Sequence, residues 1–134
     1  MVKLYSSVNR SWMELNYPDP FQPQTIEALR LDADNVYANA SYRDIWREKW
    51  AVFIGGAYTH NRDRVESGFG NDERQQSGQM RFTMARSLSE KLKLKFGGEY
   101  LQGVFDEHFR DSGNQRFHTL RRERYSAAFA ETDL

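Results

Sequence analysis

The chain contains no cysteine, which excludes disulfide bonds, thiol chemistry and cysteine-bound metal. Its 19 basic residues equal its 19 acidic residues, so it has no net charge with which to attract nucleic acid. No run of about 18 apolar residues is present, so no membrane-spanning helix is expected. Residues 1–17 also lack the apolar segment of a signal peptide, so none is expected.

Apolar residues are few, but aromatic residues are many. The apolar fraction is 39%, below the roughly 45–50% of ordinary soluble domains. Phe, Trp and Tyr nevertheless make up 14% of the chain. Because disordered chains are poor in aromatic residues, this composition predicts a folded chain.

The strongest pattern is a two-residue alternation between 91 and 105. Leu92, Leu94 and Phe96 occupy even positions, whereas the odd positions around them carry Lys91, Lys93 and Lys95. A helix would place Gly97 and Gly98 in its middle, at a cost of about 1 kcal/mol each. The alternation therefore favours a β-strand with one apolar and one polar face.

Five further segments are predicted to be extended. Met80, Phe82 and Met84 alternate with polar residues, and a similar alternation runs from 36 to 42. The remaining extended segments are 50–59, which is rich in β-forming residues, and the flanking segments 2–16 and 117–134. About six strands are expected in all.

The predicted connections alternate between short and long. Residues 47–49 and 89–91 form tight polar turns, whereas the stretches 17–34, 66–76 and 106–116 form long connections. Within the first long connection, residues 25–31 are compatible with a helical turn or with an extension of the next strand. In an up-and-down sheet, all the tight turns then lie at one end and all the long loops at the other.

The predicted strands are unusually long for a soluble protein. Segment 92–105 has fourteen residues and 49–65 about seventeen, against about 5–6 in typical soluble strands. Transmembrane β-strands need about 9–11 residues and extend beyond the bilayer in many barrels. We therefore expect an all-β fold: an antiparallel up-and-down meander of about six long strands that is part of a transmembrane β-barrel.

The barrel interpretation assigns an environment to specific side chains. Lys93 and Lys95 would line the lumen. Trp46 and Trp50 flank a tight turn, and with Tyr58 and Tyr100 they are expected at the membrane interface. The side chains expected to face lipid are Met80, Phe82, Met84, Leu92, Leu94 and Phe96.

The same alternation predicts strand register. A three-residue turn at 89–91 sets Leu88 opposite Leu92, and the pairs that follow are Met84 with Phe96, Phe82 with Gly98 and Met80 with Tyr100. The Phe82 ring is expected to cover the backbone that Gly98 leaves bare. Arg86 then falls opposite Leu94. For the earlier hairpin, the prediction sets Tyr42 opposite Val52 and Ala40 opposite Ile54.

No catalytic, cofactor or metal site is predicted. His60, His108 and His118 have no ligand-like spacing, and they are interpreted as solvated loop residues. Asp106-Glu107-His108 is interpreted as a charged loop end, and the glycine-rich stretch 68–72 as a flexible loop tip, because it matches neither a phosphate-binding nor a calcium-binding loop. An enzyme is not expected.

Two groups of basic residues allow two interpretations: Lys91, Lys93 and Lys95, and Arg121, Arg122 and Arg124. They fit a solvated strand face, or else an anion-attracting lumen or nucleic-acid groove. The zero net charge argues against nucleic acid as a partner.

Several phrases together resemble a known family. They are residues 34–42 (DNVYANASY), 57–63 (AYTHNRD), 96–100 (FGGEY) and 125–134 (YSAAFAETDL). The chain resembles a stretch of the β-barrel domain of TonB-dependent outer-membrane receptors, of the kind found in Bacteroidetes. The resemblance implies a 22-stranded barrel with a plug domain, which takes up iron–siderophore complexes, cobalamin, glycans or peptides.

The resemblance also implies partners and a location. The partners would be the lipid bilayer, the rest of the barrel, a plug domain, the TonB complex and a small-molecule ligand, in the outer membrane of a Gram-negative bacterium. Residues 1–134 are expected to be a partial barrel without plug or TonB box, ending within a strand. The alternatives are a small porin-like barrel and a soluble β-sandwich or lipocalin-like binding module.

Overall fold

Six long β-strands and no helix make up the computed structural model, which describes residues 1–19, 21–22, 24–47, 49–89 and 92–133. The strands follow one another along the chain as β1 (Val2–Pro18), β2 (Ile26–Trp46), β3 (Trp50–Glu66), β4 (Gly70–Ser87), β5 (Lys93–Arg110) and β6 (Arg116–Asp133). Pro18 is the last residue of β1, and the other two prolines, at positions 20 and 23, come before β2 in the sequence. No strand therefore has a proline in its interior, which is one reason the strands grow so long.

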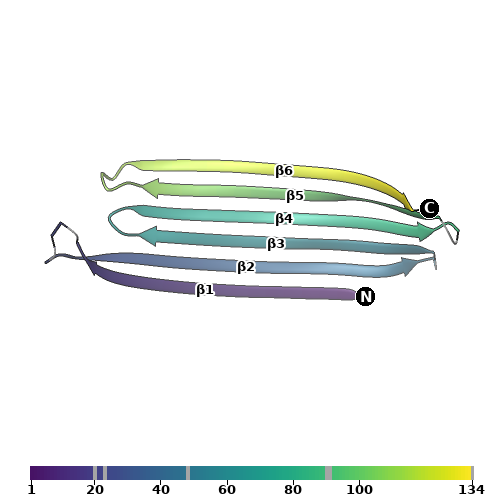
Figure 1. The fold of residues 1–134 in the computed structure, drawn as a ribbon, viewed down its shortest axis with the longest axis horizontal. Helices are drawn as coiled ribbons and strands as arrows, with labels where there is room; N and C mark the ends of the chain where they lie inside the picture. Colours follow the sequence, from purple (N-terminus) through teal and green to yellow (C-terminus); the bar gives the residue numbers. More distant parts are fainter. Residues whose placement is uncertain (20, 23, 48, 90–91, 134) are drawn as a thin grey trace.

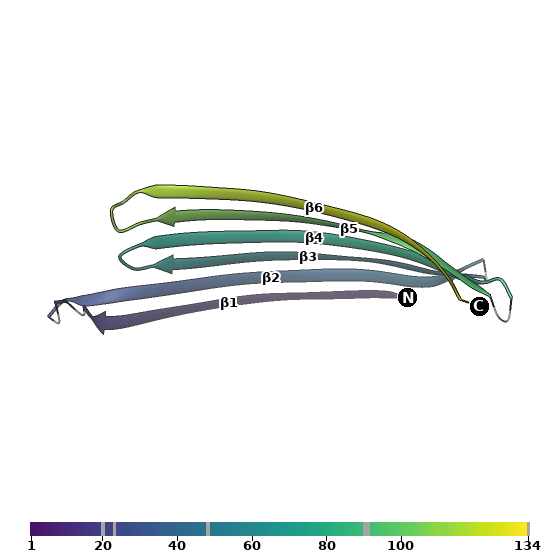
Figure 2. The same ribbon diagram turned by 45° about the horizontal axis from the view of Figure 1, so that its top comes forward.

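The strands form one antiparallel meander, as predicted. Each strand pairs with the next along the chain, in the order β1-β2-β3-β4-β5-β6. Figure 1 shows both chain ends at the same end of the sheet as the β2–β3 and β4–β5 turns. The turned view in Figure 2 shows the six strands curving together as one layer.

The register sorts the whole chain onto two faces. In every strand pair the partner numbers sum to an even value, as in Val2 with Tyr42, Trp46 with Trp50 and Lys93 with Asp133. Side chains alternate along a strand, and no bulge interrupts the pairing of the described strand residues. Even-numbered strand residues therefore share one face, here called the even face, and odd-numbered residues share the other, the odd face.

The predicted register of the β4–β5 hairpin is confirmed. Met84 pairs with Phe96, Phe82 with Gly98 and Arg86 with Leu94. The Leu88 amide donates to the Leu92 carbonyl at 2.8 Å, in agreement with the predicted closing pair. Residues 90 and 91 of this predicted turn lie outside the described residues.

The proposed reason for one pair is wrong. The expectation was that the Phe82 ring covers the bare backbone of Gly98. A Cβ built on Gly98 meets only the Ala127 carbonyl oxygen, at 3.1 Å, so the ring lies elsewhere. In this hairpin a ring lies over the neighbouring Gly97 instead, on the odd face, where the Phe129 ring comes within 2.9 Å of the Cβ position.

The predicted register of the β2–β3 hairpin is wrong by two residues. Tyr42 pairs with Ile54 rather than Val52, and Ala40 with Gly56 rather than Ile54. The ladder closes at Trp46 and Trp50, and Arg47 takes a left-handed conformation with φ 52°. The register error is two residues, which is an even number. Each side chain of β2 and β3 therefore stays on the face that was predicted for it.

The predicted long connections are mostly strand. The turn between β3 and β4 is reduced to residues 67–69, and the turn between β5 and β6 spans 111–115. Residues 26–31 belong to β2, which settles the earlier alternative in favour of a strand extension. The backbone ladder continues through these polar segments, so Asp72 and His108 are strand residues rather than loop residues.

The sheet has no second layer among the described residues. None of their side chains is buried, and both faces are open in Figures 1 and 2. Backbone pairing and cross-strand contacts therefore hold the sheet together, and burial of apolar surface contributes little.

In the part of the chain that the structure describes, no helix is long and apolar enough to cross a membrane.

Candidate functional site

An apolar band crosses the even face near the tight-turn end of the sheet. It spans the even positions from Trp50 to Tyr58 on β3 and the positions paired with them on the other strands. Its charged side chains are Asp44 and Arg86 near the tight-turn border and Arg124 at the opposite border. Its uncharged polar members include Ser6, Gln102 and Thr132. The other members are Val2, Leu4, Ala38, Ala40, Tyr42, Trp46, Trp50, Val52, Ile54, Gly56, Tyr58, Gly78, Met80, Phe82, Met84, Leu94, Phe96, Gly98, Tyr100, Ser126, Ala128 and Ala130.

The four predicted interface aromatics lie at the borders of this band. Trp46 and Trp50 form a cross-strand pair at the tight-turn border, while Tyr58 and Tyr100 lie toward the opposite border. Trp50 and Tyr58 are eight residues apart, or about 27 Å along the strand. A strand tilt of about 40° would reduce that to roughly 21 Å, close to the apolar height of about 25 Å in outer-membrane barrels.

Arg86 is accommodated at the tight-turn border. It lies opposite Leu94 in the ladder, and its guanidinium carbon is 5.4 Å from the centre of the Trp50 ring. The Phe96 ring packs edge-on against the same Trp50 at 5.9 Å. The long Arg86 side chain thus places its guanidinium against the Trp50 ring in a cation–π contact, at the border of the apolar surface.

Five of the six predicted lipid-facing residues share the even face within strands: Met80, Phe82, Met84, Leu94 and Phe96. Leu92 lies in the turn just before β5. Met80 is the most open of the five, with 64% of its surface exposed. Sequence alternation therefore predicted correctly which side chains share a face.

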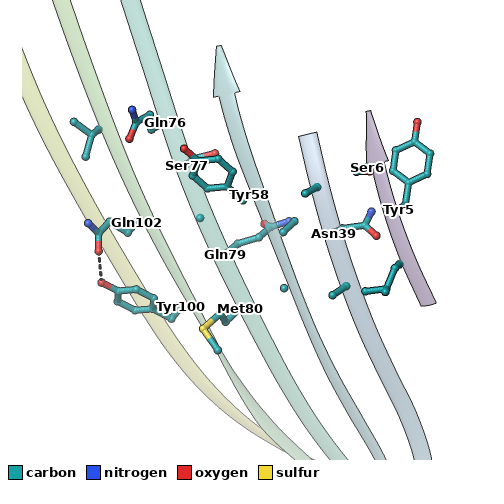
Figure 3. Close-up of a pocket in the computed structure, with 17 residues that line it drawn as sticks. Tyr5, Ser6, Asn39, Tyr58, Gln76, Ser77, Gln79, Met80, Tyr100 and Gln102 are labelled. Atoms are coloured by element: carbon teal, nitrogen blue, oxygen red, sulfur yellow. Dashed lines mark hydrogen bonds between the residues drawn. The ribbon is translucent and has the colours of Figure 1, made fainter. Parts of the chain in front are cut away.

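Small residues leave a depression in the apolar band toward the border that is farther from the tight turns. Ala38, Ala40, Gly56 and Gly78 line the floor of a shallow depression on the even face. Figure 3 shows Tyr58, Met80 and Tyr100 around it, with the Tyr100 hydroxyl donating to Oε1 of Gln102 at 3.0 Å. The depression is apolar and open, and it brings no catalytic set of side chains together.

The odd face is polar, and several of its Lys and Arg side chains lie against aromatic rings. Lys95 forms an ion pair with Glu131 at 3.1 Å, and its ammonium lies 5.9 Å from the centre of the Phe129 ring. Arg81 lies at the same distance from that ring. Cation–π contacts of this kind hold a charge in place while leaving it accessible to water. Two further pairs are Arg43 over Phe53 at 5.1 Å and Arg121 over Phe105 at 5.6 Å.

The two predicted basic groups do not form one patch. Lys93 and Lys95 lie on the odd face as expected, whereas Lys91 lies outside the described residues. Arg121 also lies on the odd face, but Arg122 and Arg124 lie on the even face. Alternation along β6 thus separates three arginines that are close in sequence.

Beyond the apolar band, the even face becomes charged. Asp72 is the centre of a cluster with Arg62, Arg64 and Arg74, at 2.7, 3.8 and 3.3 Å. Hydrogen bonds from Arg62 lower the pKa of Asp72 from 3.8 to about 2, against the opposing effect of desolvation. The same contact raises the pKa of Arg62. A second ion pair, Arg10 with Asp34 at 2.5 Å, joins β1 to β2.

The structure brings together two histidines that sequence reasoning treated separately. His108 and His118 are a cross-strand pair on β5 and β6, with rings stacked 4.4 Å apart. Nε2 of His118 lies 2.8 Å, and Nδ1 of His108 lies 3.4 Å, from the same Oδ1 of Asp106. Such a set of imidazole and carboxylate groups is able to bind a transition-metal ion. The prediction that these residues are separate loop residues is wrong.

A signal for this pairing was present in the sequence. The triplet His108-Phe109-Arg110 is mirrored by Arg116-Phe117-His118, which is what a hairpin with a central turn at residue 113 would pair. His60, the third histidine, lies on β3 and is not part of the cluster.

Comparison with known proteins gives no further assignment: no protein-family model matches the chain, and no curated protein sequence matches it significantly.

Proposed function

We propose that this chain forms part of the wall of a transmembrane β-barrel in the outer membrane of a Gram-negative bacterium. The barrel would belong to a TonB-dependent receptor that takes up an iron–siderophore complex, cobalamin, a glycan or a peptide. One observation carries the proposal: a single uncovered sheet has a mainly apolar band, nine residues long on β2 to β6 and shorter on β1, on one face and a polar opposite face. Lipid requires the first face, and a water-filled lumen suits the second.

The charged half of the even face supports the same arrangement. Beyond Tyr58, β3 continues through Arg62 and Arg64 to Glu66, and β4 carries Asp72 and Arg74 at the same level. These charges would be costly in lipid. We infer that the strands project out of the bilayer here, as in barrels whose strands extend on the external side. The tight turns, such as 47–49, then lie on the periplasmic side.

The proposed mechanism is capture followed by energised passage. The external strand ends and their turns would contact the ligand first, and the odd face would form part of the path through the barrel. There Arg81, Glu99 and Tyr125 line a shallow depression on the odd face. A plug domain and the TonB complex, supplied by other parts of the receptor, would open that path.

Accessibility labelling of single cysteines tests the location. The chain has no cysteine of its own, so a cysteine can be placed at Phe82 on the even face or at Thr83 on the odd face. In intact outer membranes, we expect a membrane-impermeant maleimide to label Thr83→Cys and to spare Phe82→Cys until detergent is added. Recovery of both variants in the soluble fraction, without detergent, would instead indicate a soluble sandwich or lipocalin-like module.

Uptake measurements test the transport role. Deletion of the gene should abolish accumulation of one ligand from a panel of iron–siderophore complexes, cobalamin, glycans and peptides. A protonophore should stop the same uptake in wild-type cells, because the TonB complex draws its energy from the proton gradient. Uptake that the gene supports but the protonophore leaves unchanged would indicate a porin-like barrel.

A further inference from the structure

We propose that Asp106, His108 and His118 form a binding site for Zn²⁺ at the end of the β5–β6 hairpin. This inference goes beyond the proposed transport function. It requires only that β5 and β6 pair in the observed register.

The backbone places the three ligands on one face. Asp106 and His108 are two residues apart on β5, so both project from the even face, and His118 lies directly opposite His108 on β6. Both strands continue to Arg110 and Arg116 before the chain turns. The site therefore rests on paired backbone rather than on a loop, and this fixes the ligand positions in advance of binding.

The ligand atoms are close to the separation that zinc requires. Metal–ligand distances of about 2.0–2.1 Å place tetrahedral ligand atoms about 3.3 Å apart. Oδ1 of Asp106 lies 2.8 Å from Nε2 of His118 and 3.4 Å from Nδ1 of His108, and all three atoms lie within 4.8 Å of one another. Small rotations of exposed side chains are enough to complete the geometry.

The cluster is also open to solvent. The side chains of His108 and His118 are 56% and 52% exposed, and they line a shallow depression between the ends of β3 to β6. An ion can therefore enter, and water can fill the remaining coordination position. Two imidazoles with one carboxylate are a donor set that favours Zn²⁺ over the oxygen-preferring Ca²⁺ and Mg²⁺.

A neighbouring carboxylate is already engaged. Asp72 lies opposite His108 in the β4–β5 ladder, but Arg62 and Arg74 hold its oxygens at 2.7 and 3.3 Å. The proposed ligand set is therefore limited to Asp106, His108 and His118.

Metal titration of the full-length protein tests the site. Zinc content is measured after equilibrium dialysis for the wild type, for His108→Gln/His118→Gln and for His60→Gln, a histidine on the same face outside the cluster. We expect the double variant to bind one Zn²⁺ fewer per chain, and His60→Gln to match the wild type. Identical zinc stoichiometry and affinity in all three proteins would overturn the proposal.

Two further readouts separate loss of ligands from loss of fold. Co²⁺ in place of Zn²⁺ should give visible absorption bands in the wild type that weaken in Asp106→Asn. Zn²⁺ should slow amide exchange across the β5–β6 hairpin end, from Phe109 to Phe117, in the wild type and not in the double variant. If metal-free exchange is the same in both proteins and Zn²⁺ protects neither, the residues form only a hydrogen-bonded cluster.

Discussion

Arg62 donates two hydrogen bonds to Asp72, from Nε to Oδ1 at 2.9 Å and from Nη2 to Oδ2 at 2.7 Å. This two-point contact joins β3 to β4 near the turn of their hairpin. Its partners are only 30% and 24% exposed, so water screens it less than an ordinary surface ion pair.

Replacing Asp72 by Asn should loosen this end of the sheet. The change removes the negative charge that Arg62, Arg64 and Arg74 share, and it leaves three cations close together. We expect a loss of about 1–2 kcal/mol in local stability, seen as faster amide exchange between Val65 and Asn71. Asp63→Asn, on the opposite face of β3, is the matched control and should leave that exchange almost unchanged.

The same contact predicts a dependence on pH. The pKa of Asp72 is lowered from 3.8 to about 2, chiefly by hydrogen bonds from Arg62. Because the folded-state pKa is below the ordinary value, the stabilisation is fully present above pH 3.8 and is lost as the pH falls toward 2. The difference in urea midpoint between wild type and Asp72→Asn should therefore shrink between about pH 5 and about pH 2.5. A constant difference would show that the Asp72 charge is not the source.

The faces of the sheet could be predicted from the sequence because alternation is a local property. A three-residue turn at 89–91 sets Leu88 opposite Leu92. Counting back equally along both strands then places Met84 opposite Phe96, as observed. The two-residue error in the other hairpin lies in the register and not in the turn. The predicted turn at 47–49 closes at Trp46 and Trp50 and sets Tyr42 opposite Ile54, as observed, so the predicted pair of Tyr42 with Val52 did not follow from that turn.

The histidine cluster was missed because strand ends were mistaken for loops. Residues 106–116 were predicted to be a long connection, which placed His108 in a loop. His108 and His118 were therefore not expected to pair, although 117–134 was predicted to be extended. In the structure, β5 and β6 extend almost to the turn, and a positive φ at Asn114 helps to close it. A polar strand that faces water on both sides lacks the apolar alternation on which strand prediction depends.

Gly97 should not tolerate a side chain. A Cβ built there lies 2.2 Å from the Phe82 carbonyl oxygen and 3.1 Å from Cα of Thr83, so the backbones of β4 and β5 would have to separate. We expect Gly97→Ala to cost about 1–3 kcal/mol, as overpacking does, and to speed amide exchange on both strands. Gly78→Ala is the matched control, since its Cβ meets no atom within 4 Å, and it should change stability by less than about 0.5 kcal/mol.

Neighbouring residues on opposite faces should respond differently to a new charge. Met80 lies on the even face within the apolar band, and Gln79 lies beside it on the odd face. If the band contacts lipid, Met80→Lys should cost about 2–4 kcal/mol because it places an ammonium near the bilayer midplane, and Met84→Lys up to the same amount. Gln79→Lys should cost little, as should Lys95→Gln, because both positions face water. The measurement is the urea dependence of folding of the full-length protein into phospholipid vesicles. Similar midpoints for Met80→Lys and Gln79→Lys would show that lipid does not cover the even face.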